Sequence, residues 1–367
     1  MPQRRKHQVV EGLMMDACLT SCPCNDKLRD IWFRNPTVHP ETKKLIVIDG
    51  PVWKSLVARF GVPPATNQQR RVIYTGYWLS DNDVPSLVNK WKNANITNVI
   101  LTFITQLDTS KPLSDAYSMT LAYKDLSPAN KQLLKDNFVL GVSYGGGAAM
   151  PAPYSNTFAP GAYYQNNPEK LAQDFVALCG DLDEYYDLDI EHIDDKFDEC
   201  AEFLGRICVE LRRLKPNCEI SHAPQPPYFI GQYGNVYNKI YNNYKDYFNF
   251  FNIQYYNNGP SNSYEEVFIT SPQDFPNVAV LQLMAAGIDG SYIVVGKPVN
   301  ANEGSAGGYI PLVPTLGDIV QQAFANPNLS TWSNNGGVMI WYYNTQDQVS
   351  VDNDSIITFM KRISYLS

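Results

Sequence analysis

The chain has 367 residues, of which 44% are hydrophobic and 18% charged, and its formal net charge is −8. This composition excludes wholesale disorder, and the acidic balance argues against a nucleic-acid-binding surface. No apolar run approaches the length of about 18 residues that a transmembrane helix needs, so no membrane partner is expected. Aromatic residues make up 13% of the chain, including 24 tyrosines, and their rings suit stacking on sugars as well as core packing.

Residues 1–70 have a mixed character and predict an N-terminal extension of unknown role. The basic start, Met1 to His7, is followed by Gln-Val-Val-Glu-Gly instead of the long apolar segment of a secretory signal. The protein is therefore expected to be cytoplasmic, or to be exported or assembled by a non-classical route. Its seven cysteines are expected to be free thiols, because Cys18, Cys22 and Cys24 lack the partners that would complete a zinc site.

From residue 71 the sequence alternates strand patterns with helix patterns. Eight strands are predicted, at Val72–Tyr77, Asn98–Ile104, Phe138–Ser143, Asp187–Glu191, Glu219–Ala223, Phe250–Tyr256, Val278–Leu283 and Gly336–Trp341. Helices are predicted between them at Val84–Asn93, Ser127–Asp136, Asn167–Gly180 and Phe197–Leu214. Within the extension, the sequence predicts a short strand at Leu45–Ile48 and a helix at Val52–Phe60.

This alternation predicts a parallel sheet, and eight units over residues 71–367 suit a closed (β/α)8 TIM barrel of the α/β class. A doubly wound open sheet is the alternative, but no glycine-rich phosphate fingerprint follows the first strand. Gly145, Gly146 and Gly147 lack the lysine and the serine or threonine of a P-loop. No metal and no cofactor is therefore expected.

The predicted fourth strand, Asp187-Leu188-Asp189-Ile190-Glu191, alternates acidic with aliphatic residues. Because side chains two apart on a strand share a face, Asp187, Asp189 and Glu191 are expected to project together. Crowded carboxylates disfavour full ionisation, so at least one pKa should be raised and a proton shared. The simpler alternative is a solvated face on an edge strand.

Polar and aromatic residues recur where the predicted strands end. They are Tyr77, Ser143-Tyr144-Gly145-Gly146, Asp187 to Glu191, Ala223-Pro224-Gln225, Gln254-Tyr255-Tyr256-Asn257 and Trp341. In a TIM barrel the active site lies at the carboxyl ends of the strands. Carboxylates, an amide, phenols and an indole around one mouth predict a sugar-binding site.

Six motifs carry a resemblance to a known family. The signature Asp-x-x-Asp-x-Asp-x-Glu is matched by Glu184 to Glu191, and the motif Ser-x-Gly-Gly by Ser143 to Gly146. Further motifs are matched at Asp189 to His192, Ala223 to Gln225, Gln254 to Asn258 and Gly336 to Trp341. From about residue 71 onward, the sequence resembles the family 18 glycoside hydrolases, the chitinase family, and most closely its plant class III chitinase and narbonin branch.

The resemblance implies hydrolysis of chitin or other polymers of β-1,4-linked N-acetylglucosamine by a substrate-assisted retaining mechanism. Glu191 would protonate the glycosidic oxygen, Asp189 would orient the 2-acetamido group, and Asp187 would share a proton with Asp189. Tyr256 would hydrogen-bond the acetamido oxygen, and Trp341 would form the floor of the sugar subsite. The residues implied in substrate binding are Tyr77, Ser143, Gly145, Gly146, Gln225, Gln254, Asn257 and Trp341.

Two residues depart from the family signature. Glu184 stands where the family usually has Asp, and Tyr185, expected just before the strand, stands where it prefers Gly. With the extension and the missing export signal, these departures favour a second function, a non-catalytic carbohydrate-binding or structural protein that assembles through residues 1–70. The connection of residues 284–335 between the last two predicted strands contains no large insertion, which in this family implies a shallow, open groove.

Overall fold

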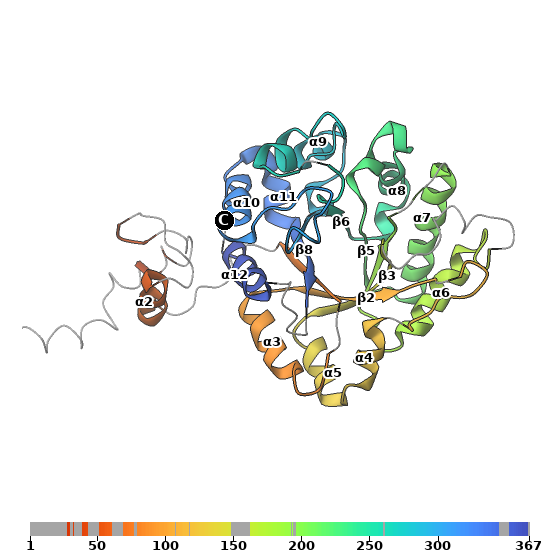
Figure 1. The fold of residues 1–367 in the computed structure, drawn as a ribbon, viewed down its shortest axis with the longest axis horizontal. Helices are drawn as coiled ribbons and strands as arrows, with labels where there is room; N and C mark the ends of the chain where they lie inside the picture. The colour runs from red at the N-terminus through yellow and green to blue at the C-terminus, as the bar shows by residue number, and fades with distance from the viewer. Residues whose placement is uncertain are drawn as a thin grey trace, which may run out of the picture. The chain divides into compact units, whose positions relative to one another are not determined.

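The computed structural model describes residues 28–29, 32, 39–42, 51–60, 69–76, 79–106, 108–116, 118–147, 162–191, 193, 196–259, 261–344 and 352–365 (Figure 1). The chain divides into two compact units, residues 1–66 with 365–367, and residues 67–364. Within the described ranges, no helix is long and apolar enough to cross a membrane.

The larger unit is built around a closed barrel of eight parallel strands in chain order, which confirms the predicted TIM barrel. The strands are β1 (Arg70–Thr75), β2 (Asn98–Ile104), β3 (Val139–Gly145), β4 (Tyr185–Asp189), β5 (Glu219–His222), β6 (Phe250–Gln254), β7 (Ile293–Pro298) and β8 (Gly337–Tyr343). β1 pairs with both β2 and β8, which closes the sheet. Nearly all strand residues are buried, because a parallel barrel is covered by helices outside and filled by side chains inside.

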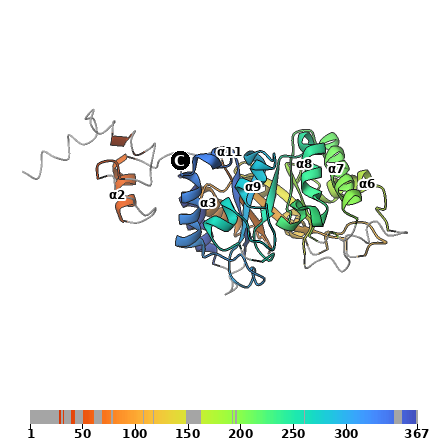
Figure 2. The same ribbon diagram turned by 90° about the horizontal axis from the view of Figure 1, so that it is seen from above.

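Helices surround the barrel (Figures 1 and 2). They are α3 (Val84–Asn93), α4 (Met119–Asp125), α5 (Pro128–Lys135), α6 (Pro168–Cys179), α7 (Phe197–Leu214), α8 (Val236–Tyr244), α9 (Val280–Ala285), α10 (Gly317–Phe324), α11 (Ser330–Asn335) and α12 (Asn353–Ile363). The predicted start of α6 is confirmed, because the Asn167 side chain accepts a hydrogen bond from the backbone N–H of Lys170 at 3.1 Å. Gly180, with a φ of 63°, follows the last residue of this helix.

The predicted seventh strand at Val278–Leu283 is wrong. Most of this segment, Val280–Leu283, forms the start of helix α9, and the seventh strand is Ile293–Pro298 instead. A short apolar run has no periodicity that separates a strand from a buried helix, and the β-branched run Ile293-Val294-Val295 was the better strand signal. The connection before β8 is therefore residues 299–336, not 284–335.

The acidic strand β4 begins at Tyr185, so the expectation that Tyr185 precedes the strand is also wrong. Its ring is fully buried inside the barrel, where it packs against Phe250 with ring centroids 5.8 Å apart. Gly141 of β3 is the direct neighbour of Tyr185 in the sheet, and a Cβ at Gly141 would collide with the Tyr185 ring. The missing side chain on β3 therefore makes room for the large one on β4.

The smaller unit contains helix α2 (Pro51–Phe60) and a compact aromatic cluster. Trp53 and Phe60 of α2 both approach Trp32, with centroid distances of 5.4 Å and 5.9 Å. Tyr365, near the end of the chain, packs on Trp53 at 5.1 Å. The predicted helix in the extension is confirmed, whereas the strand predicted at Leu45–Ile48 and three of the cysteines (Cys18, Cys22 and Cys24) lie outside the described residues.

Candidate active site

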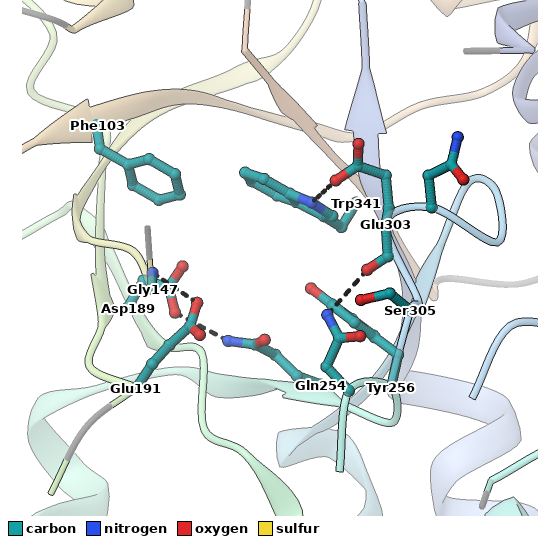
Figure 3. A pocket seen from close by; sticks show the side chains of 11 residues that line it. Phe103, Gly147, Asp189, Glu191, Gln254, Tyr256, Glu303, Ser305 and Trp341 are labelled. Carbon is teal, nitrogen blue, oxygen red and sulfur yellow. Dashed lines mark hydrogen bonds between the residues drawn. The ribbon is translucent and has the colours of Figure 1, made fainter. Parts of the chain in front are cut away.

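A cavity of about 290 Å³ opens at the carboxyl ends of the barrel strands (Figure 3). It is lined by Phe103, Gly147, Asp189, Glu191, Gln254, Tyr256, Asn257, Asn302, Glu303, Ser305 and Trp341. Six residues predicted from the sequence are among these, namely Asp189, Glu191, Gln254, Tyr256, Asn257 and Trp341. Five other predicted residues belong to the acidic strand or contact it or Glu191, namely Asp187, Ser143, Gly145, Gly146 and Gln225. Tyr77 lies outside the described residues.

Asp187 is the deepest of the three acids and is completely buried. Its Oδ2 accepts hydrogen bonds from Ser143 Oγ at 2.7 Å and from Tyr74 OH at 2.9 Å, and its Oδ1 accepts one from Ser221 Oγ. Burial raises the pKa of Asp187, and these three donors oppose the rise because they stabilise the charged form.

Asp189 lies two residues further along β4, nearer to the cavity, and is 4% exposed. Its Oδ1 accepts a hydrogen bond from Gln254 Nε2 at 2.9 Å. The pKa of Asp189 is raised well above its ordinary value, first by burial, then by the charge of Glu191 and then by that of Asp187. A carboxyl group in this position therefore favours the protonated form.

Glu191 follows two residues after the end of β4 and points into the cavity. The backbone N–H of Gly147 donates to its Oε1 at 3.0 Å, and Gln225 Nε2 donates to its Oε2 at 3.2 Å. Tyr228 OH donates to the backbone carbonyl of Glu191 at 3.0 Å, which fixes the chain beyond the strand. β4 lies between β3 and β5, so these acids are not on an edge strand.

The glycines at the end of β3 allow that strand to approach the acidic strand closely. Gly145 has a φ of 117°, and a Cβ there would collide with the backbone carbonyl of Asp189. The N–H of Gly146 donates to the same carbonyl at 2.9 Å. A Cβ at Gly146 would lie 2.9 Å from the ring of Phe103. This glycine run is thus a packing feature and not a phosphate cradle, as its sequence indicated.

Two bulges direct aromatic rings into the cavity. β2 has one more residue than β3 between the Leu101 and Ile104 pairings, and this irregularity contains Phe103. β8 likewise has one residue more than β1 in the stretch that contains Trp341. The two rings stack with centroids 5.6 Å apart and an angle of 27° between their planes. Together with Tyr256 they form an aromatic boundary suited to the apolar faces of a sugar.

The loop after β7 forms the remaining wall through Asn302, Glu303 and Ser305. The Trp341 indole N–H donates to Glu303 Oε2 at 3.0 Å (Figure 3). Asn257, with a φ of 59°, donates to the backbone carbonyl of Glu303 at 2.8 Å. The sequence alone did not predict this wall, because the seventh strand was predicted in the wrong place, nor Phe103, because strand alternation does not reveal a bulge.

A buried lysine lies behind this wall. The ammonium of Lys297 on β7 donates to the backbone carbonyls of Tyr255 at 2.8 Å, Ser261 at 2.5 Å and Gly308 at 2.9 Å. Burial lowers the pKa of Lys297 to about 7, whereas three carbonyl acceptors favour the ammonium, which has three N–H donors. Lys297 thus joins the loops after β6 and β7, which carry Asn257 and Glu303.

The described residues contain no group of three or more histidine, cysteine or acidic side chains arranged to hold a metal ion. The residues that line the cavity supply carboxyl groups, amides, a serine hydroxyl, a phenol and aromatic faces. Such a site can move protons and orient a polar ring substrate.

In sequence comparisons, no protein-family model and no curated protein matches this chain. The structure is similar to a GH18 chitinase from Pseudoalteromonas aurantia (21% identity, TM-score 0.51, covering 78% of this chain and 97% of that one). It is also similar to a fungal endo-β-N-acetylglucosaminidase of glycosyl hydrolase family 18 (14% identity, TM-score 0.55, covering 82% and 98%). A mutant GH18 chitinase from Cycas revoluta in complex with (GlcNAc)4 matches at 14% identity and a TM-score of 0.51, covering 80% and 99%.

The chain has the fold of the family 18 chitinases. The likeness extends over almost the full length of these chitinase-fold chains. The resemblance inferred from six sequence motifs is thereby confirmed at the level of the fold.

Proposed function

We propose that the protein is a glycoside hydrolase that cleaves polymers of β-1,4-linked N-acetylglucosamine by a substrate-assisted retaining mechanism. The observation that supports this best is the row of carboxyl groups formed by Asp187, Asp189 and Glu191. This row extends from the barrel interior into a cavity bounded by Tyr256 and Trp341. The chitinase fold of the chain and the (GlcNAc)4 complex of one structural neighbour are consistent with it.

In the first step, Glu191 takes up the proton that Asp189 holds and gives it to the glycosidic oxygen, which takes the electron pair of the breaking bond. The carbonyl oxygen of the 2-acetamido group attacks the anomeric carbon and forms a cyclic oxazolinium. Asp189, left as a carboxylate once its proton has passed to Glu191, orients the acetamido group and stabilises the positive charge that develops on its nitrogen. Tyr256 OH donates a hydrogen bond to the acetamido oxygen.

In the second step, Glu191 acts as a base and takes a proton from water, which attacks the anomeric carbon from the side that the leaving sugar has vacated. The acetamido oxygen leaves, so two inversions give net retention. Gln225 and the Gly147 N–H hold the carboxyl group of Glu191 in place for both proton transfers. Trp341 supplies the apolar surface beneath the reacting sugar.

The cavity, at about 290 Å³, lies at the lower end of the range of small-ligand pockets. It therefore encloses only part of a polymer, and neighbouring sugars lie in an open groove. We further propose that residues 71–367 form the catalytic module and that residues 1–70 are an extension that promotes self-association.

The test is cleavage of a fluorogenic chito-oligosaccharide by wild type and Glu191→Gln, which keeps the shape of the side chain but cannot donate the proton. Loss of at least about 100-fold in kcat, with unchanged thermal unfolding, supports the proposal. If neither protein cleaves but both bind the oligosaccharide, a carbohydrate-binding protein is the correct interpretation. If neither protein binds, the glycan assignment is wrong.

A further inference from the structure

Among the carboxyl groups that line the described cavity, only Glu303 comes from outside the acidic strand segment. It lies beside Trp341, on the opposite side of the cavity from Glu191 (Figure 3). Its backbone N–H donates to Asn300 Oδ1 at 3.1 Å, and its backbone carbonyl accepts from Asn257 Nδ2 at 2.8 Å. The position of Glu303 is therefore fixed by its main chain as well as by its side chain.

The two carboxylate oxygens of Glu303 differ in their surroundings. Oε2 accepts the hydrogen bond from the Trp341 indole at 3.0 Å. In the described part of the chain, no donor contacts Oε1. The Glu303 side chain is partly exposed and lines the cavity, so Oε1 is placed to meet a ligand.

The electrostatic character of the cavity favours cationic ligand groups. Three carboxyl side chains line it, Asp189, Glu191 and Glu303, and no described lining residue is Lys, Arg or His. The residues between 69 and 365 that the structure does not describe contain no Lys or Arg either. A cleft lined by one sign of charge attracts the opposite sign and repels its own.

We propose that Glu303 is a specificity-determining residue that selects partly deacetylated N-acetylglucosamine chains, in which some sugars carry a free amino group. The inference rests on the proposed function of the same cavity. An N-acetylated sugar occupies the reacting position beside Asp189 and Tyr256, and the ammonium of a neighbouring glucosamine pairs with Oε1 of Glu303. Glycans that carry carboxylate groups are disfavoured at the same position.

A purely structural role for Glu303, that of orienting Trp341, is the alternative, and Glu303→Gln separates the two. The amide oxygen of Gln still accepts the indole hydrogen bond, whereas the negative charge is lost. Glu265→Gln is the matched control, because it removes one charge from an exposed residue that does not line the cavity.

The experiment compares kcat/KM for fully acetylated and partly deacetylated chito-oligosaccharides of equal length, at low salt and mildly acidic pH. Wild type and Glu265→Gln should prefer the partly deacetylated substrate by about two- to fivefold, the range of a partly exposed ion pair. Glu303→Gln should lose this preference, so that its kcat/KM values on the two substrates become equal. The preference of wild type should shrink as salt is added.

The inference is overturned if wild type shows no preference, or if Glu303→Gln loses the same factor in kcat/KM on both substrates. Either result leaves the proposed function standing. Absence of cleavage of either substrate overturns the proposed function. In that case calorimetric binding of the two oligosaccharides decides the inference: a preference that Glu303→Gln removes supports it, and equal affinities overturn it.

Discussion

At the scale of single residues, the two buried acids of β4 differ in the number of hydrogen-bond donors that stabilise their charged forms. Asp187 accepts hydrogen bonds from Ser143, Tyr74 and Ser221, which all favour its charged form. Asp189 accepts one from Gln254 and faces Glu191 and Asp187 as neighbouring charges. The proton that the three carboxyl groups share is therefore held mainly by Asp189 before the substrate binds beside it.

The raised pKa of Asp189 makes a prediction about stability. The folded chain keeps a proton on Asp189 that the unfolded chain has already released, so stability falls as pH rises above the ordinary Asp value of about 4. Asp189→Asn removes this effect. At neutral pH the free energy of unfolding of this variant should exceed that of wild type by about 1.4 kcal/mol for each unit by which the fold raises the pKa of Asp189, up to the pH of the measurement. Cleavage by the variant should fall by about 100-fold or more.

Urea unfolding of wild type and Asp189→Asn over a range of pH checks this prediction. The difference between the two proteins should grow with pH and vanish near pH ~4. A difference that stays constant with pH would contradict the assigned protonation of Asp189.

At the scale of elements, one wall of the cavity depends on a residue that does not touch it. Lys297 joins the loops after β6 and β7 through three backbone carbonyls, those of Tyr255, Ser261 and Gly308. Both loops contribute residues that line the cavity, Asn257 from the loop after β6 and Glu303 from the loop after β7. The wall is therefore held together from behind by one buried ammonium.

Lys297→Met should leave these three carbonyls without their buried donor. We expect the free energy of unfolding to fall by about 2–4 kcal/mol, because unsatisfied buried polar groups are costly. KM for chito-oligosaccharides should rise more than kcat falls, since this wall positions the substrate, whereas the acids lie on β4 and just after its end. The control is Lys239→Met, which removes an exposed ion pair with Asp198 and should cost less than about 1 kcal/mol. Equal losses in both variants would contradict the proposed role of Lys297.

The sequence predicted most of the barrel because regular periodicity carries the signal. Helix Val84–Asn93 and strand Asn98–Ile104 have the predicted bounds, and the acidic alternation placed Asp187 and Asp189 correctly inside the barrel. Irregular features carry no such signal. The bulge that turns Phe103 inward and the loop that presents Glu303 depend on pairing between strands distant in sequence, which a single sequence does not reveal.

At the scale of the whole molecule, every described cavity residue belongs to the unit of residues 67–364. A protein reduced to this unit should therefore keep kcat/KM on chito-oligosaccharides within about twofold of the full chain. Trp53→Ala tests the same point in the full chain, because it leaves a gap in the aromatic cluster of the smaller unit at a cost of about 3–5 kcal/mol to that unit.

Cleavage assays and sedimentation of the three proteins provide the measurement. If the extension promotes self-association, the full chain should sediment as a larger species than the shortened protein. If the shortened protein and Trp53→Ala both lose most of their activity, the barrel depends on the smaller unit for catalysis and the prediction is wrong.

The fit between Gly141 and Tyr185 bears on how this barrel changed during evolution. The tyrosine at position 185 needs the space that Gly141 leaves on the neighbouring strand. A lineage that acquired the tyrosine first would have carried an overpacked barrel, so we expect the glycine to have come earlier or at the same time. Among related sequences, positions 141 and 185 should therefore vary together, with a large ring at one accompanied by glycine at the other.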